Sequence, residues 1–273
     1  MADKTRIAWS DATWNPVTGC TKVSSGCKHC YAEREWRRLA AAPHTVYTGR
    51  SFTSVRVHPE RLGQPLRWRR PRRIFVNSMS DLFHEAVSDG FIDQVLAVML
   101  LAPHHTFQVL TKRPERMRAY FAGVDLYARV LAAANVLRAD HPRLRLDRIR
   151  IDDPASPMAC HIWWGVSVED QKAADQRIPL LLEVPVANHW ISAEPLLERI
   201  EIGFCHAFGG GGAGLQEIAQ VGSGWRRIRP LRSSSTGGLD PEGARRLRAG
   251  WCAVLREAAG CVFSRSAQRD HGL

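Results

Sequence analysis

The chain has 273 residues, of which 45% are hydrophobic and 24% charged, and its formal net charge is +11. This composition is typical of a folded globular protein, and the length suffices for one large α/β domain or two small ones. No apolar run approaches the roughly 18 residues that a transmembrane helix needs. The first sixteen residues hold no apolar stretch that could act as a signal peptide. We therefore expect a cytoplasmic protein with no membrane partner.

The positive charge is carried almost entirely by arginine, because only five of the 38 basic residues are lysine. A basic balance is compatible with a nucleic-acid partner. A solvated, arginine-rich surface explains it about as well, and no RNA-recognition, zinc-finger or helix-turn-helix signature is present. Nucleic acid is thus one candidate partner that charge alone does not establish.

Short apolar runs alternate with helical patterns between residues 73 and 193, which is the rhythm of βα units around a parallel sheet. The apolar runs end at turn-forming or polar residues, and the helical stretches show apolar positions at helical spacing. The predicted strands are 73–77, 106–110, 162–168 and 189–193, and the predicted helices are 91–101, one that begins near 114, 127–139 and 171–183.

The pattern weakens beyond residue 203. The glycine-rich run 209–214 is not followed by Lys-Ser or Lys-Thr, so it predicts a linker rather than a phosphate-binding loop. Residues 243–259 predict a closing helix. We therefore divide the chain into a core at 1–203, with a cysteine loop and βα units, and a divergent, irregular basic region at 204–273 that could complete a barrel.

Each predicted strand runs directly into a polar cluster. In a parallel α/β barrel the carboxyl ends of the strands open on one face, where ligands bind. Polar loops after strands are common, but four in succession indicate one site built from several loops. The candidates to line this site are Ser80, Asp81, Lys112, Ser167, Glu169 and Glu194.

Three cysteines lie within eleven residues, as Cys20-x6-Cys27-x2-Cys30. Soft thiolates favour zinc or an iron–sulfur cluster. A structural zinc site needs four protein ligands, which His29 or His44 would complete. Three thiolates on a four-iron–four-sulfur cluster would instead leave one iron without a protein ligand, open to chemistry. The remaining alternative is three unrelated thiols in a loop.

Residues 15–34, which contain these cysteines, resemble the opening of an uncharacterised phage-borne and bacterial protein family. Further stretches resemble it as well, so that the resemblance covers roughly residues 5–202. More distantly, the Gly-Cys…Cys-x2-Cys-Tyr-Ala opening resembles radical S-adenosylmethionine (SAM) proteins, in particular those like spore photoproduct lyase. The further stretches are 72–84, 110–117, 164–171 and 192–197.

This resemblance implies a partial or full βα barrel in which Cys20, Cys27 and Cys30 hold a [4Fe-4S] cluster and SAM occupies its open iron. One electron, from a donor such as flavodoxin or ferredoxin, would cleave SAM to a 5′-deoxyadenosyl radical. That radical would abstract hydrogen from a substrate, with nucleic acid among the candidates, while the protein orients the cofactor. Carboxylates at the strand ends would bind the SAM amine or ribose hydroxyls, and Lys112 would bind the SAM carboxylate. An ion pair between Lys112 and a neighbouring acid is the alternative.

The sequence departs from these families in three ways. The first cysteine gap is six residues, where radical SAM proteins have three, and no Gly-Gly-Glu element follows the second strand. Apolar segments that the phage-borne family carries near its C-terminus are replaced at 231–240 and 262–266. Two rival functions therefore stand beside the radical SAM hypothesis. One is a zinc protein, structural or hydrolytic, and the other is a non-catalytic nucleic-acid-binding phage accessory protein.

Overall fold

A computed structural model describes residues 5, 7, 9–144, 159–198 and 200, together with three later strands. Its main sheet contains five parallel strands that pair in the order in which they occur along the chain. These strands are β1 (Ala12–Trp14), β4 (Arg73–Val76), β5 (Thr106–Thr111), β6 (Ile162–Ser167) and β7 (Asn188–Ala193).

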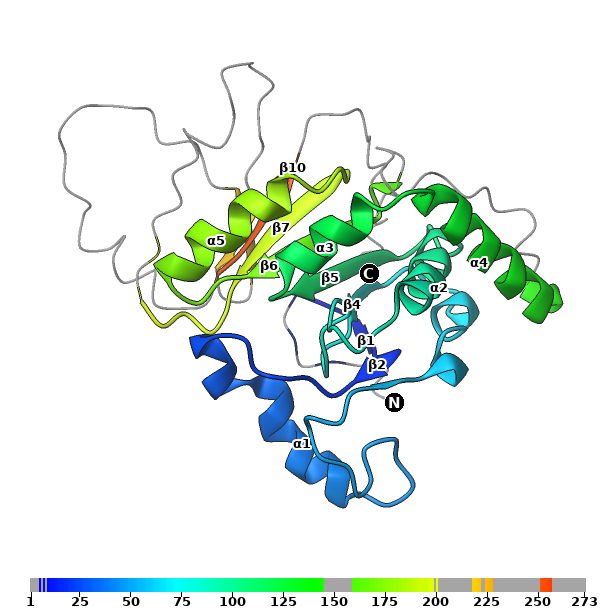
Figure 1. Cartoon of the computed structure of the whole chain (residues 1–273), viewed down its shortest axis with the longest axis horizontal. Helices are drawn as coiled ribbons and strands as arrows, with labels where there is room; N and C mark the ends of the chain where they lie inside the picture. Colours follow the sequence, from blue (N-terminus) through cyan, green and yellow to red (C-terminus); the bar gives the residue numbers. More distant parts are fainter. Residues whose placement is uncertain are drawn as a thin grey trace, which may run out of the picture.

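Helices connect the parallel strands, as the alternating sequence pattern predicts, and the prediction of an α/β fold is confirmed. Figure 1 shows α2, α3, α4 and α5 along one side of the sheet, whereas α1 extends away from it. Two helices begin at capping side chains: Ser88 accepts a hydrogen bond from the backbone of Phe91, and Asp170 accepts one from Ala173. The helices are α1 (Tyr31–Ala41), α2 (Asp89–Leu100), α3 (Pro114–Phe121), α4 (Leu126–Asp140) and α5 (Gln171–Leu182).

The two faces of the sheet are both apolar but pack differently. Ile74 and Phe107 are register partners and lie in the large core that the helices cover. The alternate residue Phe75 packs on the opposite face with Trp9 and Trp190. Trp9 and Phe75 from this second face also line the cavity described below.

Shorter elements complete the described structure. Strands β2 (Val17–Thr18) and β3 (Arg56–Val57) form a separate antiparallel pair. Four 3₁₀ turns are η1 (Ser25–His29), η2 (Pro59–Arg61), η3 (Pro65–Arg67) and η4 (Pro142–Leu144). Within the described residues, no helix combines the length and the apolar character that crossing a membrane requires.

The prediction of a closing helix at residues 243–259 is wrong for the part that the structure describes. Residues Trp251–Arg256 form strand β10, which pairs antiparallel with β7 along six residues. A short apolar run fits a strand as well as a helix, and the open edge of β7 supplies the pairing partner. Strands β8 (Ile218–Val221) and β9 (Gly224–Arg227) extend the sheet further. The predicted linker at 209–214 lies outside the described residues.

Gly165 is required by the packing of Trp190 against the sheet. A Cβ atom at this position would lie 2.5 Å from Nε1 of Trp190, whose indole is fully buried and donates a hydrogen bond to the carbonyl of Val109. We expect Gly165→Ala to lower the free energy of unfolding by about 1–3 kcal/mol, because the indole cannot move without losing that bond. Urea denaturation measures the change.

Gly90 provides the matched control for this prediction. It lies in α2, and a Cβ atom there would meet nothing within 4 Å. Gly90→Ala should therefore raise the stability by about 0.4–1 kcal/mol through the unfolded state. Equal effects of the two substitutions would contradict the role assigned to Gly165.

Candidate functional site

A cavity of about 730 Å³ opens at the carboxyl ends of the parallel strands. Its volume lies within the range of small-molecule and cofactor sites. The wall combines the strand ends with the cysteine loop, and Ile7, Trp9, Phe75 and Leu110 form an apolar part. The sequence-predicted residues that line it are Cys20, Cys27, Cys30, Ser80, Asp81, Lys112, Ser167 and Glu194.

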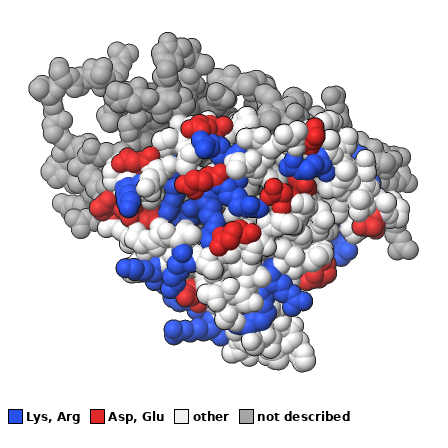
Figure 2. Space-filling model, in the orientation of Figure 1, with Lys and Arg blue, Asp and Glu red and all other residues white. Residues whose placement is uncertain are grey.

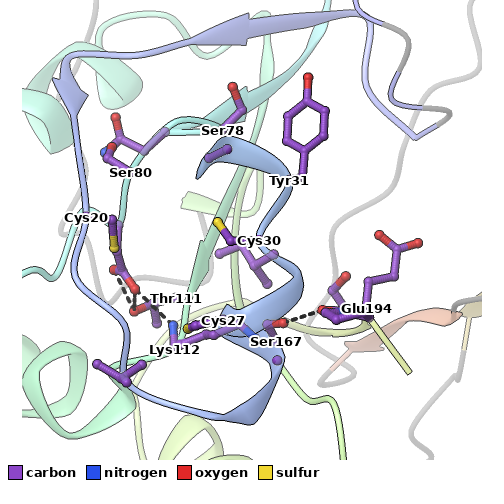
Figure 3. A pocket seen from close by; sticks show the side chains of 18 of the residues that line it. Cys20, Cys27, Cys30, Tyr31, Ser78, Ser80, Thr111, Lys112, Ser167 and Glu194 are labelled. Carbon is purple, nitrogen blue, oxygen red and sulfur yellow. Dashed lines mark hydrogen bonds between the residues drawn. The ribbon is translucent and has the colours of Figure 1, made fainter. Parts of the chain in front are cut away.

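The cysteine loop is held on two sides. Gly19 has a φ of 90° and lies so close to the chain at Ser54 that a Cβ atom would come within 2.5 Å of that carbonyl oxygen. Its amide donates to Met79, and the amide of Cys20 donates to the carbonyl of Phe52. Cys27 lies in turn η1, and Cys30 is the residue directly before α1. Figure 3 shows Cys20 across the cavity from the turn that carries the other two cysteines.

The thiols of Cys20 and Cys27 have different electrostatic surroundings. Burial and the nearby charge of Asp81 raise the pKa of Cys20 to about 12, although Arg113 donates to its Sγ at 3.9 Å. Burial also acts against ionisation of Cys27, but hydrogen bonds from the backbone of Val23 and Ser24 outweigh it and lower the pKa of Cys27 overall. The cavity therefore stabilises a thiolate at Cys27 more than at Cys20.

Asp81 lines the cavity and also accepts several hydrogen bonds from neighbouring residues. Its carboxylate accepts from Oγ1 of Thr111 at 2.8 Å, from the amide of Lys112 at 3.0 Å and from the amide of Phe83 at 2.9 Å. These bonds tie the loop after β4 to the end of β5. Arg113 lies 3.7 Å from the same carboxylate. Asp81 thus holds two strand ends together.

Glu169 lies behind the cavity wall rather than in it. Its side chain is 0% exposed and accepts from Lys112 Nζ at 2.9 Å and from Arg177 Nη1 at 2.8 Å. Burial opposes its charge, but hydrogen bonds from Ser24, Lys112 and Arg177 lower the pKa of Glu169 to about 2. Lys112 is therefore in the ion pair that the sequence left as an alternative to binding a ligand carboxylate.

The Glu169 ion pair also supports the cysteine turn. A Cβ atom on Gly26 would lie 2.8 Å from Lys112 Nζ and 2.9 Å from the Glu169 side chain, so the turn packs directly on the pair. The neighbouring Ser25 donates to Asp170 at 2.7 Å. The loop after β6 therefore positions the turn that carries Cys27.

Three hydrophilic side chains that line the cavity can still accept hydrogen bonds from a ligand. Ser80 and Ser167 each use their hydroxyl proton within the protein, donating at 2.8 Å to the carbonyls of Val17 and Glu194. Their oxygens can still accept a bond from a ligand. Within the described residues, the carboxylate of Glu194 has no hydrogen-bond or ion-pair partner, and desolvation in the cavity wall raises its pKa. A cationic or hydroxyl-bearing ligand would satisfy it.

Arg113, Thr21, His29 and Tyr31 also line the cavity but were not predicted to do so. Arg113 follows Lys112 in the polar cluster after β5, so its position signalled the site. Its guanidinium donates to Oγ1 of Thr21 at 2.8 Å and to Glu85 at 3.1 Å. His44 does not line the cavity.

Comparisons with known proteins give one match. A family model described as "Protein of unknown function (DUF5131)" matches residues 4–262. No curated protein and no solved structure matches the chain. The chain therefore belongs to this family of unknown function.

Proposed function

We propose that this protein binds a [4Fe-4S] cluster through Cys20, Cys27 and Cys30 and uses it to cleave SAM reductively. The observation that carries the proposal is the arrangement of three thiols around one cavity at the carboxyl ends of parallel strands. In this proposal the five parallel strands form a partial βα barrel that encloses the cofactors. The substrate enters through the same opening.

The chemistry of the three thiols supports a cluster rather than a single metal ion in this proposal. Among the described residues, no three His, Cys, Asp or Glu side chains converge closely enough to hold a single metal ion. Zinc would need its sulfur ligands at about 2.3 Å from one centre. Three thiols that line one cavity match in number the protein ligands of a four-iron cluster that keeps one iron for a small molecule.

When bound, the cluster would supply one electron, from a donor such as flavodoxin or ferredoxin, to split SAM into methionine and a 5′-deoxyadenosyl radical. The residues of the chain would position the reactants. Glu194 would accept hydrogen bonds from the SAM ammonium or ribose, and the Ser80 and Ser167 oxygens would accept further ones.

Charge and water exclusion are the other contributions of the chain. Lys112 and Arg113 place positive charge beside the thiolates, which stabilises the anionic form of the ligands. Trp9, Phe75 and Leu110 form an apolar wall that keeps water from a radical. These roles use side chains that the fold already holds in place.

The experiment that tests this proposal measures 5′-deoxyadenosine. Iron-loaded protein, prepared without oxygen and reduced with dithionite, is expected to release 5′-deoxyadenosine and methionine from SAM. Glu194→Gln should raise the SAM concentration needed for half-maximal release while the iron content stays unchanged, because the cluster ligands are intact. If iron-loaded, reduced protein gives no 5′-deoxyadenosine even with nucleic acid present, the enzymatic proposal is wrong.

A further inference from the structure

Helix α1 carries exposed basic residues at positions other than those that it buries. Ala32 and Trp36 are buried, whereas Arg34 and Arg37 are exposed. Arg34 and Arg37 follow Tyr31 at intervals of three residues, so the three side chains lie on one side of the helix. Figure 2 shows basic side chains over α1, at the lower left of the view. We call Lys28, Arg34 and Arg37 the basic stripe.

The basic stripe is not neutralised by neighbouring acids. Residues 20–41 contain five basic and two acidic side chains. Both acids are already paired, Glu33 with Lys22 at 2.9 Å and Glu35 with Arg38 at 3.1 Å. Within the described part of the chain, Lys28, Arg34 and Arg37 form no ion pair or side-chain hydrogen bond. Three exposed, unpaired cations within ten residues of the chain favour a polyanionic partner.

The basic stripe starts at the mouth of the cavity. Four residues between Lys28 and Arg34 line the cavity, and two of them, His29 and Tyr31, are also exposed. Tyr31 is 50% exposed although it is a large aromatic residue. An exposed ring beside a row of cations is the combination that binds single-stranded nucleic acid, with phosphates on the cations and a base on the ring.

We propose that a single-stranded nucleic acid lies along α1, with its phosphates on the basic stripe and one base stacked on Tyr31. The next nucleotide would then reach the cavity beyond the ring. This inference names the substrate class of the proposed enzyme and rests on the proposed function for the reaction, although the binding itself needs neither cluster nor SAM. An acidic protein segment would fit the charges but has no regular series of flat rings to stack.

The test is fluorescence anisotropy of a labelled single-stranded DNA 20-mer with the full-length protein, without SAM or reductant. The double variant Arg34→Gln/Arg37→Gln should bind more weakly, and its plot of log K against log salt should be shallower by about 1.4, because two phosphate contacts are lost. Tyr31→Ala should weaken binding about 5- to 150-fold, whereas Tyr31→Phe should keep it, because the ring stacks without its hydroxyl.

The matched control is Arg118→Gln/Arg138→Gln, which removes the same charge from α3 and α4 and should leave the salt slope unchanged. An equal loss in this control would overturn the inference. So would a duplex that binds as tightly as the single strand, or competition by polyglutamate at equal charge concentration. If SAM is cleaved but the oligonucleotide does not bind, this inference fails and the proposed function stands. If the oligonucleotide binds but SAM is not cleaved, the proposed function fails and this inference stands.

Discussion

Cys27→Ala is expected to remove most of the iron from protein prepared without oxygen. The wild-type protein should be brown and contain about four iron atoms per chain, the content of one four-iron cluster. Cys27 is the thiol whose ionised form the surrounding backbone favours. Cys20→Ala and Cys30→Ala should have the same effect, because each removes one of three protein ligands. Iron and sulfide analysis with the visible absorption spectrum measures the loss.

Cys160→Ala is the matched control for the cysteine variants. Cys160 is not in a disulfide and does not line the cavity, so its replacement should leave the iron content unchanged. Wild-type protein with one colourless zinc per chain would instead favour the zinc protein. Protein with no metal would favour the non-catalytic accessory protein. An unchanged iron content in Cys27→Ala would show that this residue is not a ligand.

Glu169→Gln is expected to lower the free energy of unfolding by about 3–5 kcal/mol. The substitution leaves the buried Arg177 and the partly buried Lys112 without their counter-charge, and breaking a buried pair in this way is strongly destabilising. It should also reduce the iron content, because Gly26 in the cysteine turn packs on this pair. Chemical denaturation of the apoprotein separates the first effect from the second.

Glu183→Gln controls for the loss of one carboxylate. Glu183 pairs with Arg118, and the two side chains are 54% and 46% exposed. An exposed pair contributes about 0–1 kcal/mol, so this variant should remain close to the wild type in both stability and iron content. Similar losses in the two variants would contradict the role assigned to Glu169.

The order of the central elements could be predicted from the sequence because their signals are local. The strand predicted at 73–77 is observed as Arg73–Val76, and the helix predicted at 171–183 as Gln171–Leu182. Apolar periodicity and capping residues decide such elements within a short window. The strand at Trp251–Arg256 was missed because its partner, β7, is remote in the sequence.

The sequence predicted most of the polar residues that line the candidate site, but not the ion pairs and hydrogen bonds that they form. Strand-end position identified the polar side chains that gather at the cavity, because parallel strands end on one edge. It could not distinguish Glu194, which has no partner within the described residues, from Glu169, which is buried between two cations. That difference depends on Arg177 from α5 and on the packing of the cysteine turn. Neither contact leaves a signal in the local sequence.

The hydrogen bond between Ser25 and Asp170 joins residues 145 positions apart. Closing so large a segment costs chain entropy before any cofactor contact is gained. The two halves of the pocket therefore meet only in a chain that has already reached its native topology. A cofactor bound by both segments would stabilise the native fold. The fraction of protein that retains the cofactor would therefore measure how much of the central sheet is folded.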